Sequence, residues 1–154
     1  MNDRYKALNI ERLKTLSEEI RDALNNLREY DGLSDTEILS NKTILNATKY
    51  NFIVAIQAVI DICHHIVARL SGKVPDEYGE CFLLLKDMAL IDPEYAIRLK
   101  SMAGFRNILI HLYHEVDDER VCKHLKNDLG VIEDFLDVIK TIAEKKEKGE
   151  EHLP

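Results

Sequence analysis

Apolar residues recur every three or four positions through most of this chain, and that spacing constrains its fold more than any other feature. Between about residue 4 and residue 30, five residues carry the repeat: Leu13, Leu16, Ile20, Leu24 and Leu27. Residues at these intervals lie on one face of an α-helix. Only six glycines and three prolines occur in 154 residues, so the sequence predicts long amphipathic helices.

Turn and capping residues divide this helical pattern into segments. Asp31-Gly32 ends the first segment, because glycine suits the left-handed conformation that closes many helices. Ser34 and Glu37 have the spacing of a capping box, in which a hydroxyl and a carboxylate satisfy the first free amides. We expect a long helix from here to about Leu70, followed by a loop at residues 71–75.

The second half of the chain shows three further helical segments. A short one is expected over about residues 78–89. The triplet Asp92-Pro93-Glu94 combines a cap, a proline at the first helical position and an acid in the first turn. It opens a helix that we expect to reach about His114, with a bend near Gly104. Residues 117–119 open the last predicted helix.

These segments predict an all-α fold, an antiparallel up-and-down four-helix bundle with one additional short helix. No internal repeat and no long linker divides the chain. We therefore expect a single helical domain over residues 1–147. Residues 148–154 follow a run of charged side chains and are predicted to form a flexible tail.

Charge argues against a broad nucleic-acid surface. The formal net charge is −7, from 21 basic and 28 acidic side chains. Non-specific binding to nucleic acid depends on many Lys or Arg contacts with phosphate, so any RNA site must be local. Basic residues that could extend such a site near the motif described below are Arg69, Lys73, Arg98 and Lys100, although such residues are more often a solvated face.

The three cysteines and the chain's first residues point to the cytoplasm. Cys63, Cys81 and Cys122 are odd in number and form no Cys-x-x-Cys pair, which disfavours a disulfide framework or a zinc knuckle. The first residues lack the apolar core of a signal peptide. No continuous apolar run reaches the roughly 18 residues needed to span a membrane, so we expect no membrane association.

The predicted helix that ends near His114 carries a group of polar side chains, here called the polar wedge, which consists of Arg106, Asn107, His111 and Tyr113. At about 100° per residue, Arg106, Asn107 and His111 fall on the side opposite the apolar residues around them, and Tyr113 falls near Arg106. Arg106 and His111 are about 140° apart in this projection. A site that uses both is therefore more natural across a two-fold axis between two copies of the helix. Ile110 lies inside the wedge, where it could pack at such a dimer seam.

The wedge has the pattern Arg-x4-His-x-Tyr, from Arg106 through His111 to Tyr113. This pattern resembles the signature of HEPN proteins, in the form found in HepT-like toxins. Residues 52–70 are similar to the long central helix of that family, and motif position, chain length and helix order agree over most of the chain. The resemblance implies a dimeric ribonuclease toxin with a composite cleft, paired with a minimal nucleotidyltransferase antitoxin.

RNA can be cleaved without a metal, and the motif has suitable side chains. A histidine titrates near neutrality and can move the proton of a ribose 2′-hydroxyl, so His111 is the predicted general base or acid. An arginine donates two hydrogen bonds to phosphate oxygens, which is the role predicted for Arg106. Asn107 could orient His111 or contact the phosphate. The resemblance implies that Tyr113 accepts AMP from the partner, which silences the toxin.

Several alternatives remain open at this point. The chain could be a non-catalytic accessory that binds nucleotide or RNA for a nucleotidyltransferase, or a structural bundle without a ligand. Histidines that could line the cleft are His64, His65 and His114. A metal site is disfavoured, because di-metal bundles use Glu-x-x-His pairs and this chain has none. We expect no cofactor.

Overall fold

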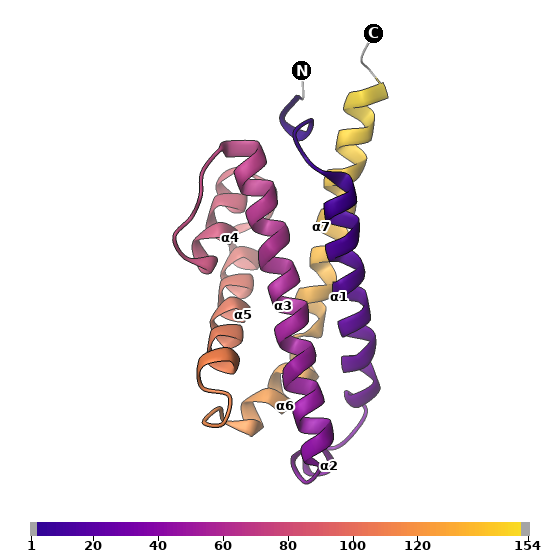
Figure 1. Cartoon of the computed structure of the whole chain (residues 1–154), viewed down its shortest axis with the longest axis vertical. Helices are drawn as coiled ribbons and strands as arrows, with labels where there is room; N and C mark the ends of the chain where they lie inside the picture. Colours follow the sequence, from indigo (N-terminus) through magenta and orange to yellow (C-terminus); the bar gives the residue numbers. More distant parts are fainter. Residues whose placement is uncertain (1–2, 152–154) are drawn as a thin grey trace.

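Helices account for most of residues 3–151, the part of the chain that this computed structural model describes (Figure 1). A 3-10 turn, η1, comes first. The bounds are η1 Asp3–Tyr5, α1 Ile10–Tyr30, α2 Asp35–Leu39, α3 Lys42–Ser71, α4 Tyr78–Asp87, α5 Pro93–His111, α6 Asp118–Asn127 and α7 Leu129–Glu151. The described residues contain no strand, so the predicted all-α class is confirmed.

Side-chain caps open most of these helices. The predicted capping box is present, with Ser34 and Glu37 bonded to each other's backbone amides. It opens only the five-residue α2, however, because the side chain of Asn41 accepts from the amide of Ile44 and starts a second helix. The expected single helix up to Leu70 is therefore two helices. Gly72 ends α3 with a left-handed φ of 71°, as a C-terminal glycine should.

Two other predicted boundaries need correction. The helix opened by Asp92 continues without interruption past Gly104 and ends at His111, three residues earlier than expected. The predicted last helix is interrupted at Asp128, where the chain turns from α6 into α7. α7 stays helical to Glu151, through the first part of the predicted tail, and residues 152–154 lie outside the described residues.

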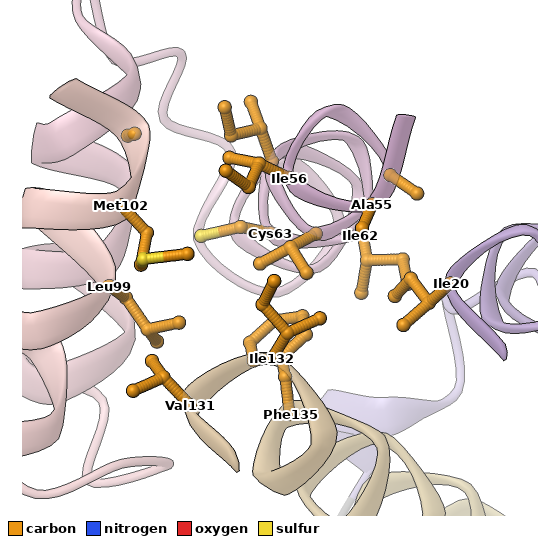
Figure 2. Close-up of a cluster of buried hydrophobic side chains, with 14 of the residues drawn as sticks. Ile20, Ala55, Ile56, Ile62, Cys63, Leu99, Met102, Val131, Ile132 and Phe135 are labelled. Carbon is orange, nitrogen blue, oxygen red and sulfur yellow. The ribbon is translucent and has the colours of Figure 1, made fainter. Parts of the chain in front are cut away.

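Four long helices build the predicted antiparallel bundle. In Figure 1, α1 descends, α3 ascends, α5 descends and α7 ascends, while α2 and α6 lie at the lower end. α3 lies at the centre and contacts every other element, and α4 packs along α5. Figure 2 shows α3, α5 and α7 meeting through Cys63, Leu99 and Ile132, with Ile20 of α1 close by. Burial of this apolar surface is the main stabilising term.

α3 is also long and apolar enough to span a membrane by length and composition, with a mean hydropathy of 1.6 over its most apolar stretch. The expectation of no such segment was therefore too strict for this helix. Of that stretch, 61% is buried inside the bundle. The apolar character of α3 follows from its central position, since neighbours surround it on most sides.

Candidate active site

An open cleft of about 650 Å³ lies between the start of α4 and the second half of α5. The residues that line it are Asp76, Glu77, Tyr78, Gly79, Lys100, Ala103, Gly104, Arg106, Asn107, Ile110 and His111. The fold brings these two segments together because α4 and α5 form an antiparallel pair joined by a short turn. Three of the predicted site residues, Arg106, Asn107 and His111, therefore share one cavity.

The sequence of α5 orients these three side chains. Phe105 and Leu109 are completely buried and fix the apolar face of the helix against α3 and its neighbours. Asn107 and His111, one helical turn apart, are then exposed on the opposite face. Although Arg106 and His111 diverge around the helix, the cleft is wide enough for both to line it within one protomer.

Arg106 is half-buried and held from two sides. Its Nη1 donates a hydrogen bond of 2.9 Å to Oδ1 of Asn107. Its Cζ lies 5.0 Å from the centroid of the Tyr78 ring, within the range of a cation–π interaction. Its Nε is buried without a hydrogen-bond partner. These contacts fix the plane of the guanidinium at the wall of the cleft.

Tyr78 makes two contacts that sequence reasoning missed. Its ring centroid lies 5.4 Å from that of His64, at an interplanar angle of 52°, and it also faces Arg106. Tyr78 opens α4, and only the docking of α4 along α5 brings it to the motif. No local sequence signal marks such a contact, because it joins positions that are far apart in the chain.

The charge of the cleft is mixed. Asp76 and Glu77 lie at one edge, while Lys100 and Arg106 supply positive charge. The aliphatic part of Lys100 lies against Gly79, where an added Cβ would come within 2.8 Å of Lys100 Cγ. Of the four basic residues expected near the motif, only Lys100 lines the cleft. Among the others, Arg69 donates to the carbonyl of Ala7, and Arg98 borders a separate hollow.

Tyr113 lies outside the cleft, because α5 ends two residues before it. The helical projection placed it beside Arg106. In the structure its hydroxyl donates to Oδ1 of Asn46 at 3.2 Å, and its ring packs beneath the ammonium of Lys49 at 4.8 Å from the centroid. The tyrosine is thus oriented by α3, on the other side of His111 from the cleft.

The three histidines considered for the cleft do not line it. His64 lies behind Tyr78, and the exposed His114 packs edge-on against the ring of Tyr113. His65 faces the N-terminal segment, where its Nε2 accepts from the amide of Asn9 at 3.0 Å. Partial burial and the nearby guanidinium groups of Arg69 and Arg12 lower the pKa of His65. Within residues 3–151, no group of three side chains suited to a metal ion occurs.

Comparison with known proteins identifies the family. The profile of the family described as ribonuclease HepT-like matches residues 20–139. An mRNA nuclease HepT of Shewanella oneidensis is 33% identical over 102 residues, which cover 66% of this chain and 73% of that protein. A tRNA nuclease HepT of Aphanizomenon flos-aquae is 31% identical over 110 residues, covering 71% and 74%.

The fold has solved counterparts. The tri-AMPylated HEPN toxin of Shewanella oneidensis, in complex with its MNT antitoxin, is 28% identical and superposes with a TM-score of 0.74. The match covers 92% of this chain and 99% of that one. The resemblance carried by the segment from Arg106 to Tyr113 is confirmed by these matches. The chain belongs to the HepT-like ribonuclease family.

Proposed function

We propose that this protein is the toxin of a type VII-like toxin–antitoxin pair and acts as a metal-independent endoribonuclease in the cytoplasm. The observation that carries this proposal is the convergence of Arg106, Asn107 and His111 on one open cleft. Such a reaction needs a general base, which His111 can supply, and a group that stabilises the charge on the phosphate, which the guanidinium of Arg106 can supply. The side-chain amide of Asn107 orients that guanidinium.

In the proposed reaction, His111 accepts the proton of a ribose 2′-hydroxyl, and the 2′-oxygen attacks the adjacent phosphorus. The bond from phosphorus to the 5′-oxygen breaks, and the leaving oxygen takes a proton from water or from the protonated His111, which leaves a 2′,3′-cyclic phosphate on one fragment and a 5′-hydroxyl on the other. Arg106 stabilises the extra negative charge on the phosphate oxygens. Asn107 holds the guanidinium through its 2.9 Å hydrogen bond, and Lys100 adds positive charge to the cleft.

The proposed active form is a homodimer with a composite site. Ile110 and Leu112 flank His111 and remain 39% and 47% exposed. Apolar side chains beside catalytic groups favour a face covered by a second copy, related by two-fold symmetry. A second motif helix would also bring a second Arg106 and so offset the acidic residues Asp76 and Glu77.

We propose that a partner nucleotidyltransferase regulates this protein by transferring AMP to Tyr113. A HEPN toxin to which this chain is similar has been solved in a tri-AMPylated form, in complex with its MNT antitoxin. The phenol oxygen of Tyr113 attacks the α-phosphorus of ATP, pyrophosphate leaves, and the phenol proton passes to a base or to water. The product carries a negative charge and a bulky nucleoside two residues after His111. Both hinder RNA at that end of the cleft.

Expression in a bacterial host tests the ribonuclease. The wild type should inhibit growth, and the variants Arg106→Ala and His111→Ala should not. The purified wild type should cleave RNA in the presence of a chelator. Equal inhibition by the wild type and both variants, or none by the wild type, contradicts this function.

A non-catalytic accessory that binds RNA or nucleotide for the nucleotidyltransferase is the alternative. The net charge of −7 and the acidic edge of the cleft favour it. In that case the wild type would bind RNA or nucleotide without cutting RNA, and neither the wild type nor His111→Ala would inhibit growth. Intact-mass measurement after co-expression with the nucleotidyltransferase tests the proposed regulation. The wild type should gain the mass of AMP, and Tyr113→Phe should not.

A further inference from the structure

Lys49 is the one charged residue among the buried polar groups of the described chain. It lies in the first part of α3, one turn after Leu45. Burying an ammonium group costs several kcal/mol unless it is paired and hydrogen-bonded. A buried lysine therefore marks a place where specific contacts compensate for the loss of water.

Within residues 3–151, the polar contacts of Lys49 go to the two ends of one turn. Lys49 Nζ donates to the backbone oxygen of Tyr113 at 3.3 Å and lies 2.9 Å from Oδ1 of Asp118. Tyr113 is near the start of the segment between α5 and α6, and Asp118 is the first residue of α6. A single ammonium thus joins both ends of the turn over residues 112–117 to the central helix.

The same group also orients the tyrosine side chain. Its nitrogen lies 4.8 Å from the centroid of the Tyr113 ring, and Asn46, one helical turn before Lys49, accepts a hydrogen bond from the phenol hydroxyl at 3.2 Å. The backbone, ring and hydroxyl of Tyr113 are each held by α3. Tyr113 is still partly exposed, so its oxygen is accessible while its position is defined.

We propose that Lys49 is a positioning residue for the modification of Tyr113: it holds the turn after α5 so that the phenol oxygen is presented to the nucleotidyltransferase. This inference rests on the proposed function of Tyr113. Attack on the α-phosphorus of ATP requires the oxygen to be in line with the departing pyrophosphate, and small misplacements of a reacting atom reduce rates by up to about 100-fold. Lys49 makes no contact with the cleft and is not part of the RNA-cleaving machinery.

The test uses the full chain, the purified partner nucleotidyltransferase and ATP. Lys49→Met keeps the length and apolar stem of the side chain but removes the charge. We expect its kcat for AMP transfer to fall about tenfold or more, with KM for ATP unchanged because the partner binds the nucleotide. RNA cleavage by Lys49→Met should stay at the wild-type level. Lys42→Met, on the exposed first turn of α3, is the matched control and should be modified normally.

Two further measurements distinguish a positioning role of Lys49 from a general loss of folding in the variant. Lys49→Arg restores a cation and should regain most of the lost rate. Amide hydrogen exchange should be faster in Lys49→Met over residues 112–117 and unchanged in α4, without any partner present. An unfolded protein would instead lose protection everywhere, in which case Lys49 would be a purely structural residue and the inference would be wrong.

The outcomes distinguish this inference from the proposed function. If wild-type protein gains no AMP at Tyr113, the proposed regulation fails and the role of Lys49 fails with it. If the wild type is modified and Lys49→Met is modified at the same rate, only the role of Lys49 is contradicted.

Discussion

The segments before and after His111 are held in place by different kinds of contact. Before it, Arg106 and Asn107 lie on a regular helix whose buried face is set by Phe105 and Leu109. After it, Tyr113 lies in a turn whose position depends on Lys49 of α3. The directions of Arg106, Asn107 and His111 thus follow from local helical geometry, whereas the turn depends on contacts between residues more than 60 positions apart in the chain.

This difference assigns separate tasks to neighbouring residues. The residues proposed to cleave RNA lie on α5, where Arg106 also donates a hydrogen bond to Asn107. The proposed modification site is held by a different helix. A change to one side should therefore leave the other side's activity intact, because in the described part of the chain no hydrogen bond or ring contact joins Arg106, Asn107 or His111 to Tyr113 or Lys49.

The largest effect is expected from the cleft. His111→Ala should lower RNA cleavage by at least about 100-fold, because general acid–base catalysis contributes factors of this size. Arg106→Ala should do the same through loss of charge stabilisation. Tyr113→Phe should cleave RNA within about twofold of the wild type, since its hydroxyl faces Asn46 and not the cleft. A loss of cleavage in Tyr113→Phe comparable to that in His111→Ala would contradict the separation.

The ion pair at the turn should show a strong asymmetry. The side chain of Lys49 is 7% exposed and that of Asp118 is 43% exposed. Asp118→Asn leaves a buried ammonium without its counter-charge and should lower the free energy of unfolding by about 1–2 kcal/mol. Lys49→Met leaves the partly exposed carboxylate of Asp118 unpaired and should lower the free energy of unfolding by less than Asp118→Asn does. Urea denaturation of both variants measures the difference, and an equal cost would mean that burial does not govern the pair.

The sequence predicted the local features of this molecule well. Caps at Ser34 and Asp92 and the apolar faces of the long helices are present. Each depends on residues within one helical turn, where the physical rules are strong. The placement of Arg106, Asn107 and His111 away from the buried face of α5 follows from the same local geometry. The left-handed glycine predicted at Gly32 is wrong, because α1 ends at Asp31 with a right-handed φ of −68°. Among the described residues the left-handed glycine is Gly72, within the predicted loop.

Features that depend on tertiary contacts were not predictable in this way. Nothing near Tyr113 in the sequence shows that α5 ends at His111, because the residues that hold the turn are on α3 and α6. Tyr78 reaches Arg106 only through the docking of α4. The break at Asp128 leaves α6 free to pack across the bundle end, with the ring of His124 stacked 4.0 Å from Phe105.

An intermediate effect is expected from Tyr78, which supports the cleft from behind. Tyr78→Leu removes the ring beneath Arg106 and should lower kcat/KM for RNA cleavage about tenfold, the scale of a partly desolvated cation–π contact. Tyr78→Phe keeps the ring and should remain close to the wild type. AMP transfer to Tyr113 should be unchanged in both variants. If Tyr78→Phe loses as much activity as Tyr78→Leu, the hydroxyl and not the ring is the important group.

The smallest effect is a pH dependence on the turn side. Burial lowers the pKa of His124 below its ordinary value of 6.5, although the carboxylate of Asp128, 2.7 Å from its Nδ1, acts in the opposite direction. The charges of Arg120 and Lys123 add to the lowering. As the pH falls below 6.5, the unfolded chain therefore takes up this proton before the folded chain does, and stability is lost. Above that value His124 is neutral in both states and contributes no slope.

His124 stacks on Phe105 and holds α6, the helix that begins at Asp118. Acidification from about pH 7.5 to about pH 5.5 should therefore speed amide exchange in α6 and over residues 112–117 more than in α4. In His124→Asn, the fall in the free energy of unfolding over this range should be smaller than in the wild type. His65→Asn removes a second histidine with a lowered pKa but lies on the N-terminal side, so it should reduce the fall without changing exchange in α6. If acid loosens α4 and α6 to the same extent, the two sides of His111 are not independent, because the cleft and the turn would then open as one unit.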